Sequence, residues 1–216
     1  MIKGVIFDLD GVLVSTDEMH FRAWQLLAWE LGITNFTKED NKRQKGVSRM
    51  ESLEVVLSKG NKIYSGEEKL GFAKQKNQCY IELLQSLNED AILPGVIDTL
   101  NMLKEKGILI GIGSVSKNTP LILERTGLTP YIDQVSCGLD ITRSKPDPEV
   151  FEVAAVKLGL LKEECLVVED SGVGIIAAKA AHMRALGVGP EYKQLRADFE
   201  AVNLQDDIDW QAILES

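Results

Sequence analysis

Short apolar segments alternate with helical patterns through the second half of this chain, and this alternation limits the possible folds more than any other feature. After Pro94-Gly95, a helical pattern through Leu100 and Leu103 ends at Gly107. The segments that follow are a strand at 108–113, a helix at 119–126, a strand near Val135, a helix at 149–158, a strand at 166–169, a helix at 173–181 and a strand at 185–188. Such alternation predicts an α/β fold with a doubly wound parallel sheet.

The first half of the chain opens with a strand and then becomes helical. Residues 2–8 are predicted as the first strand, because Val5-Ile6-Phe7 is a continuous apolar run suited to burial on both faces. A helix capped by Ser15, Thr16 or Asp17 follows and ends at Gly32. No convincing strand appears from there to about residue 90, so this stretch is interpreted as a helical insertion. The tail carries little pattern beyond a final helix at 210–214.

Composition excludes several classes of protein. With 44% hydrophobic and 26% charged residues the chain is not disordered, and it contains no apolar run as long as a membrane helix. A net charge of −9 argues against nucleic acid or an anionic membrane as a partner. Cys79, Cys137 and Cys165 are an odd number without metal-ligand spacing, and the N-terminus lacks a secretory pattern. We therefore expect a cytoplasmic protein with reduced thiols.

Two aspartates follow the first predicted strand directly. Because side chains alternate along an extended backbone, Asp8 and Asp10 point the same way from its carboxyl end. Two neighbouring carboxylates do not both keep their charge cheaply, so the pair indicates either a hard metal ion or a division between an ionised and a protonated acid. Gly11 allows a sharp turn that leaves backbone N–H groups free to face an anion. The alternative is a solvated turn.

Polar residues also follow the other predicted strands. Ser114 follows the second strand, Lys145 lies in the loop after the third, and Glu169 and Asp170 end the fourth. Ligands of open parallel sheets gather at the carboxyl ends of the strands, so one site could contain all of these groups. Simpler readings exist: the serine could cap a helix, the lysine could be a surface residue, and the two acids could cap the helix near Gly172. Together, however, the groups are those expected where phosphate and a hard metal meet.

In these residues the sequence resembles the haloacid dehalogenase superfamily of phosphotransferases. Its four motifs are matched, in order, by Asp8-Leu9-Asp10-Gly11, by Ser114, by Lys145-Pro146 and by Glu169-Asp170. Within that superfamily, three further segments are similar to the β-phosphoglucomutases: residues 20–24, 45–49 and 114–118. Each motif is weak alone, but the set is specific, and the resemblance extends over roughly residues 1–190.

The resemblance implies a fold and a set of roles. It implies a Rossmann-like core, residues 1–14 and 92–216, with an inserted α-helical cap domain, residues 15–91. Asp8 would become phosphorylated, Asp10 would be the general acid and base, and Lys145 would neutralise charge. Bound Mg²⁺ would be held by Asp8, Asp10, Glu169 and Asp170.

A second group of residues is expected to bind the rest of the substrate. The segment 42–49 holds four basic residues and no acid, so Arg49 is our first choice for a second phosphate, with Lys42 and Arg43 solvated. A mobile exposed loop is the alternative. His20 shares a helix face with Trp24 and is expected to couple cap closure to Asp10, or to be an ordinary hinge histidine. The full set of expected substrate-binding residues is Trp24, Gly46, Val47, Arg49, Lys76, Ser114, Val115, Ser116, Lys117 and Asn118.

The function that the resemblance implies is an isomerase interconverting β-D-glucose 1-phosphate and glucose 6-phosphate. It would pass through an aspartyl-phosphate and use β-glucose 1,6-bisphosphate as intermediate and activator. A capped sugar-phosphate or phosphoglycolate-type phosphatase is the main alternative, and a non-catalytic phosphosugar sensor is disfavoured because every expected catalytic group is present. We expect a monomer whose partner is a small phosphorylated sugar.

Overall fold

The computed structural model describes residues 1–216 and contains one six-stranded parallel sheet. The strands, in the spatial order β3-β2-β1-β4-β5-β6, are β3 (Gln134–Ser136), β2 (Leu109–Gly113), β1 (Gly4–Phe7), β4 (Cys165–Glu169), β5 (Arg184–Gly187) and β6 (Phe199–Glu200). The chain winds one way from β1 through β2 to β3, and the other way from β4 to β6. The predicted doubly wound sheet is confirmed, and β1 lies at the point where the winding reverses, where such sheets bind ligands.

Both faces of the sheet are covered by helices. Val5 and Phe7 of β1 face one apolar cluster, and Ile6, which points the other way, faces a second. The first cluster includes side chains of α5 (Val96–Glu105), α6 (Thr119–Arg125) and α10 (Trp210–Glu215), and the second those of α7 (Glu149–Leu158) and α8 (Gly172–Ala180). Burial on both faces explains why the central strands read as continuous apolar runs.

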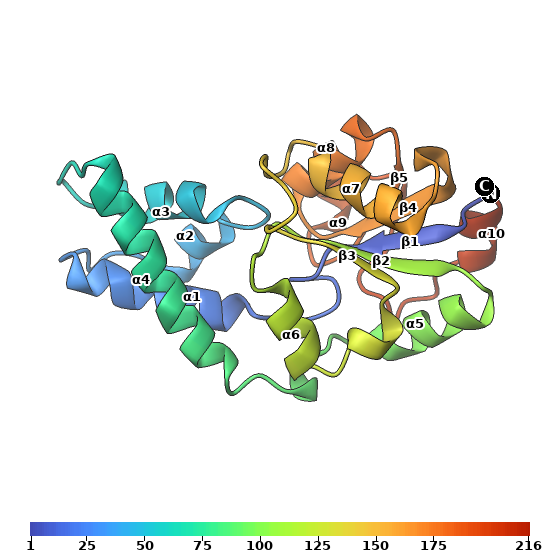
Figure 1. Ribbon diagram of the computed structural model, residues 1–216, viewed down its shortest axis with the longest axis horizontal. Coiled ribbons are helices and arrows are strands. Elements are labelled where there is room, and N and C mark those ends of the chain that lie inside the picture. The colour runs from blue at the N-terminus through green and yellow to red at the C-terminus, as the bar shows by residue number, and fades with distance from the viewer.

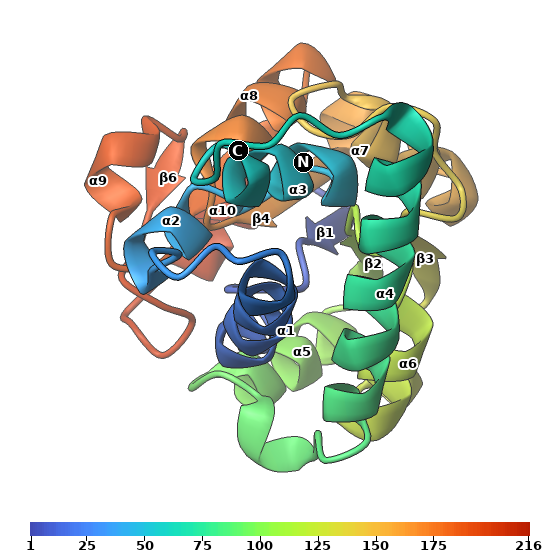
Figure 2. The same cartoon turned by 90° about the vertical axis from the view of Figure 1, so that its left-hand side faces the viewer.

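The helical insertion lies beside the sheet, beyond the carboxyl ends of the strands (Figure 1). It contains α1 (Asp17–Glu30), α2 (Lys38–Lys42), α3 (Arg49–Leu57) and α4 (Gly66–Leu84). A separate apolar cluster that includes Trp24 and Leu53 joins α1, α3 and α4, whereas Tyr80 and Leu84 at the end of α4 belong to the cluster under the sheet. Figure 2 shows α4 running beside α6, which it contacts. We propose residues 15–91 as a cap and residues 1–14 and 92–216 as a core.

The chain enters and leaves the cap through two segments that lie side by side. Val14 and Ile92 form an antiparallel bridge, and the backbone N–H of Ser15 donates to the carbonyl of Ala91 at 2.9 Å. The two connections between cap and core are thus joined to each other by hydrogen bonds.

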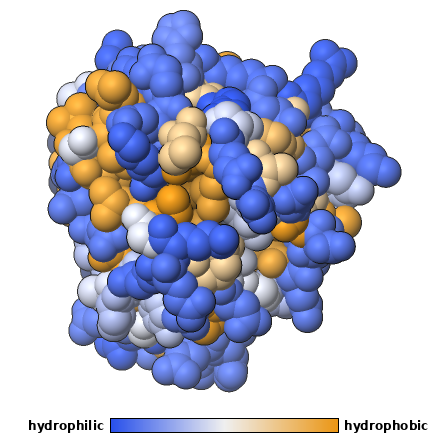
Figure 3. Space-filling model, turned by 90° about the vertical axis from the view of Figure 1, so that its right-hand side faces the viewer, coloured by the Kyte–Doolittle hydropathy of each residue, from blue (hydrophilic) through white to orange (hydrophobic).

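The remaining elements are short. They are α9 (Tyr192–Leu195) and three 3₁₀ turns at Glu89–Ala91, Thr129–Tyr131 and Lys162–Glu164. Neither α9 nor β6 was predicted, because two to four residues are too few to show a period. No helix combines the length and the apolar character that crossing a bilayer requires. Figure 3 shows the end of the core remote from the cap, where hydrophilic side chains predominate and apolar ones gather over part of the face.

Candidate active site

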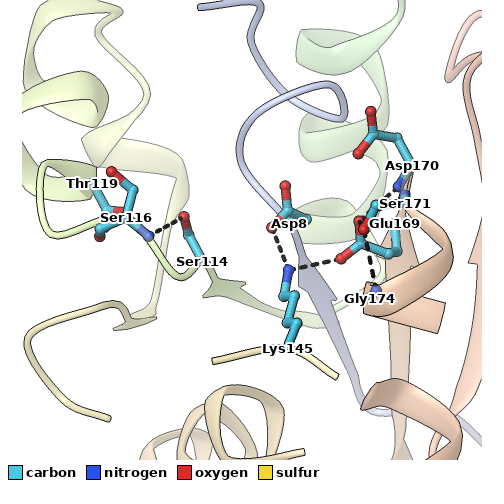
Figure 4. A network of polar contacts seen from close by, with 9 residues as sticks. All are labelled: Asp8, Ser114, Ser116, Thr119, Lys145, Glu169, Asp170, Ser171 and Gly174. Carbon is cyan, nitrogen blue, oxygen red and sulfur yellow. Dashed lines mark hydrogen bonds and ion pairs between the residues drawn. The ribbon is translucent and has the colours of Figure 1, made fainter. Parts of the chain in front are cut away.

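Four neighbouring strands deliver the predicted polar residues to one place. Asp8 follows β1 directly, Ser114 follows β2, Lys145 lies in the loop after β3, and Glu169 is the last residue of β4 (Figure 4). The sheet register aligns these ends, because Phe7 pairs with both Ile112 and Val168.

Lys145 occupies the centre of this group. Its ammonium lies 2.5 Å from Oδ1 of Asp8 and 2.7 Å from Oε2 of Glu169, and the residue is 1% exposed (Figure 4). Burial alone would lower the pKa of Lys145, but the charges of Asp8 and Glu169 outweigh it and hold the pKa above its ordinary value. Lys145 is therefore charged, and the reading of a surface lysine is wrong.

Glu169 is fixed by more contacts than any other acid of the site. Besides Lys145, its carboxylate accepts from the backbone N–H of Asp170 at 2.9 Å, and from the N–H and hydroxyl of Ser171 at 3.0 and 2.9 Å. Gly174 makes this possible, since a Cβ there would lie 1.9 Å from Oε2 of Glu169. The helix cap of α8 is Ser171, which accepts from the N–H of Gly174, so neither acid serves as that cap.

Three of these carboxylates suit a hard divalent cation. Asp8, Glu169 and Asp170 each offer one oxygen, and the three oxygens lie within 4.8 Å of one another. Oxygen ligands are those that Mg²⁺ prefers. Burial, followed by the charge of Glu169, raises the pKa of Asp170 to about 6. A bound cation would reduce the repulsion between the neighbouring carboxylates. Gly11 adjoins the cluster, because a Cβ there would lie 2.0 Å from Oδ2 of Asp170.

The loop after β2 is held by hydrogen bonds to its own residues. The N–H of Ser116 donates to the hydroxyl of Ser114 at 3.2 Å, and the N–H of Asn118 donates to the hydroxyl of Ser116 at 3.2 Å. Thr119 donates its hydroxyl to the carbonyl of Ser116 at 2.9 Å. The serines thus shape the loop and do not cap the helix that follows.

Asp10 is connected to the cap. Its carboxylate accepts from the hydroxyl of Thr16, which in turn accepts from the hydroxyl of Tyr80 at 2.9 Å. Thr16, one of the three residues predicted to cap α1, is its N-cap residue, but its hydroxyl makes no capping hydrogen bond and donates to Asp10 instead. Burial raises the pKa of Asp10 to about 6, although the hydrogen bond from Thr16 acts to lower that pKa. A carboxyl with that pKa can both take and give a proton near neutrality.

His20 and Lys76 form a second polar group of the cap. Nζ of Lys76 lies 2.8 Å from Nδ1 of His20, and it lies over the rings of Trp24 and Tyr80 at 4.6 and 4.5 Å from their centroids. Burial, followed by the charge of Arg49, lowers the pKa of Lys76 to about 7. Burial and the charge of Lys76 also lower the pKa of His20, which favours the neutral imidazole, and an unprotonated Nδ1 can accept from Lys76.

A single cavity of about 830 Å³ lies between the core and the cap, and it unites these groups. Every predicted site residue lines it except Glu169, which lies beneath its floor. Seven lysines and arginines line it against five aspartates and glutamates, in a chain of net charge −9. The cations are Lys45, Arg49, Lys74, Lys76, Lys117, Arg143 and Lys145. Lys42 and Arg43 are exposed and outside the cavity, as expected.

Several residues of the site were not identified from the sequence. Tyr80 and Asn77 of α4 were not singled out; Asn77 accepts from the side-chain amide of Asn118 at 2.9 Å, across from cap to core. Lys45, which pairs with Asp170 at 2.8 Å, belongs to the basic segment that the sequence did mark. The only sequence feature that pointed to Lys45 was the excess of basic residues, without any acid, in that segment.

Comparison with known proteins finds relatives in one family of phosphate-handling enzymes. The family model for haloacid dehalogenase-like hydrolases matches residues 5–188. The chain is 39% identical over 199 residues, 91% of this chain and 88% of the relative, to a β-phosphoglucomutase of Bacillus subtilis, and 30% identical over 93% of this chain and 91% of the relative to a phosphorylated carbohydrates phosphatase of Thermotoga maritima. A crystal structure of β-phosphoglucomutase from Clostridium difficile superposes with a TM-score of 0.91 at 35% identity, covering 100% of this chain and 96% of that one.

Proposed function

Because the chain belongs to the haloacid dehalogenase-like hydrolase family, we propose that it interconverts β-D-glucose 1-phosphate and glucose 6-phosphate by way of a phosphorylated Asp8. The observation that carries the proposal is that one cavity is lined by two separate groups able to hold phosphate. Asp8, Ser114 and Lys145 form the first group. Arg49, Lys117 and Asn118 form the second. A mutase working through a bisphosphate needs both, whereas a hydrolase of a monophosphate needs one.

The second group offers two cations that make no ion pair, beside the side-chain amide of Asn118. Arg49 begins α3, is half-buried, and has no carboxylate within ion-pairing distance. Lys117 is exposed at the rim of the cavity and Asn118 is half-buried in it. A guanidinium without a counter-ion is well suited to a phosphate, which it can contact through two parallel N–H groups.

In the proposed reaction, Asp8 is the nucleophile and Asp10 is the general acid and base. The acyl phosphate on Asp8 passes its phosphoryl group to the C6 hydroxyl of β-glucose 1-phosphate, while the Asp10 carboxylate takes the hydroxyl proton. The resulting β-glucose 1,6-bisphosphate turns round in the cavity. Asp8 then attacks the C1 phosphate, Asp10 returns the proton to the C1 oxygen, and glucose 6-phosphate leaves with Asp8 phosphorylated again.

Charge neutralisation makes this attack feasible. Mg²⁺ held by Asp8, Glu169 and Asp170 would offset the negative charge between the carboxylate nucleophile and the phosphoryl oxygens. Lys145 lies beside the nucleophile and can contact a phosphoryl oxygen as well. The hydroxyl of Thr16 orients Asp10, and the cap above the cavity keeps water from the acyl phosphate.

The test is ³¹P NMR of the enzyme with Mg²⁺, β-glucose 1-phosphate and a catalytic amount of β-glucose 1,6-bisphosphate. We expect glucose 6-phosphate to form in an amount equal to the β-glucose 1-phosphate consumed. Inorganic phosphate accumulating in its place would favour the second candidate, a sugar-phosphate phosphatase, which the similarity to the Thermotoga maritima phosphatase supports.

Arg49 separates the two functions further. We expect Arg49→Ala to lower kcat/KM for β-glucose 1-phosphate about 100-fold, the scale of a lost charge-assisted contact to phosphate. Hydrolysis of p-nitrophenyl phosphate, which has no second phosphate, should change less than about threefold. Arg43→Ala is the control, because Arg43 is exposed in the same segment. Equal losses on the two substrates would contradict a second phosphate site at Arg49.

A further inference from the structure

The loop between α2 and α3 reaches from the cap onto the core. Nζ of Lys45 lies 2.8 Å from Oδ2 of Asp170 and 3.6 Å from Oδ2 of Asp17. The next residue, Gly46, has φ = 72°, and a Cβ on it would lie 2.7 Å from both the hydroxyl of Ser171 and a methyl of Val173. The loop therefore lies directly on the start of α8, and Lys45 is the charge that it brings there.

Lys45 is the only cation placed against Asp170. Lys145 is occupied by Asp8 and Glu169, while the Asp170 side chain is 6% exposed and pairs with no other basic residue. Burial would lower the pKa of Lys45, but Asp170 and Asp17 outweigh it and raise the pKa, so the ammonium is charged. Half of this ion pair is thus a cap residue and half is a member of the carboxylate cluster suited to a divalent cation.

We propose that Lys45 is a positioning residue that links cap closure to the cation site: it holds the cap on Asp170 when no divalent cation is bound, and a divalent cation on Asp170 weakens that hold. A carboxylate shared by two cations attracts each of them less, and the two cations also repel each other. Linkage makes the effect reciprocal, so the closed Lys45–Asp170 contact must weaken cation binding by the same factor.

The proposal rests on the cation site of the proposed function but not on the identity of the sugar phosphate. It assigns Lys45 a role in the opening of the cap between the two phosphoryl transfers, when the bisphosphate has to turn round. A cation that arrives at Asp170 loosens the loop at 45–46, and departure of the cation restores the contact. The side chain of Lys45 is 35% exposed, so solvent partly screens its charge. The coupling between Mg²⁺ binding and the Lys45–Asp170 contact is therefore expected at the lower end of the range usual for two coupled sites.

Calorimetric titration of the chelator-stripped, substrate-free enzyme with Mg²⁺ tests this linkage. We expect Lys45→Gln to tighten Mg²⁺ binding about 5- to 20-fold, because it removes a competing charge. Lys45→Arg keeps the charge and should bind Mg²⁺ as the parent protein does. Lys42→Gln is the matched control: it lies three residues away, makes only an exposed pair with Glu39, and should leave the affinity unchanged.

Hydrogen exchange at residues 45–49 gives the reciprocal measurement. Mg²⁺ should speed exchange there in the parent protein, while in Lys45→Gln exchange should be fast already and should not respond to Mg²⁺. Equal Mg²⁺ affinity in the parent protein and Lys45→Gln would overturn the role of Lys45 and leave the proposed function standing. No Mg²⁺ binding by any variant would overturn the cation site itself, and with it both proposals.

Discussion

Replacing Asp8 by asparagine should abolish turnover and leave the fold intact. The carboxamide is not a nucleophile towards phosphorus, and losing the nucleophile of an enzyme costs on the order of 10⁵- to 10⁶-fold in kcat. The amide oxygen still accepts from Lys145, so the buried contact with that ammonium is kept. ³¹P NMR turnover and intact-mass detection of a phosphate on the protein measure the two consequences.

Asp98→Asn is the matched control for this substitution. Asp98 is an exposed residue of α5 that does not line the cavity, so the same change of charge there should leave turnover unaltered. Covalent phosphate on Asp8→Asn, or more than a trace of turnover by it, would place the nucleophile elsewhere. Unfolding curves for both variants should coincide within about 1 kcal/mol.

Lys145→Met should cost both activity and stability. It removes the cation between two carboxylates that are almost fully buried, and breaking a buried ion pair from one side typically costs about 3–5 kcal/mol. Because Lys145 also faces the transferring phosphoryl group, turnover should fall by several orders of magnitude. Urea unfolding measures the first effect and turnover the second.

A second variant separates these two effects. In Lys145→Met combined with Glu169→Gln, one of the two uncompensated carboxylates becomes neutral, so most of the lost stability should return while activity stays absent. Lys117→Met is the control for stability, because that lysine is exposed at the cavity rim and makes no ion pair. If the double variant were no more stable than Lys145→Met, the pairing of Lys145 with Glu169 would not be a source of stability.

The sheet and the convergence of its polar residues could be predicted because both follow from local patterns. Apolar runs of strand length between helical patterns fix a parallel sheet, and parallel strands end at one edge. Residues placed directly after strands, such as Asp8 and Ser114, are then carried to the same place without knowledge of any side-chain contact. Lys145 was reachable by the same argument, since its loop follows β3.

The contacts between cap and core could not be predicted, because they depend on docking that no local pattern encodes. Asn118 reaches Asn77 across 41 residues of sequence, and Lys45 reaches Asp170 across 125. Thr16 was one of three residues expected to cap a helix, and it is the N-cap residue of α1, but its hydroxyl donates to the carboxylate of Asp10, which no local pattern shows. Glu169 likewise looked like an ordinary cation ligand, whereas its carboxylate also positions Lys145 and the start of α8.

The paired connections at Val14 and Ile92 restrict how the cap can move. Two chain segments joined by backbone hydrogen bonds resist twisting and sliding past each other, since either motion would break the bonds between them. They can still bend together as a two-stranded hinge. The cap would therefore open most easily in one direction, by rotation about an axis that crosses both segments of this hinge. In the proposed reaction, each swing of the cap would return Lys45, Arg49 and Lys76 to the same places in the cavity that Asp8 lines, so a bisphosphate that has reversed its ends would meet the same site it left.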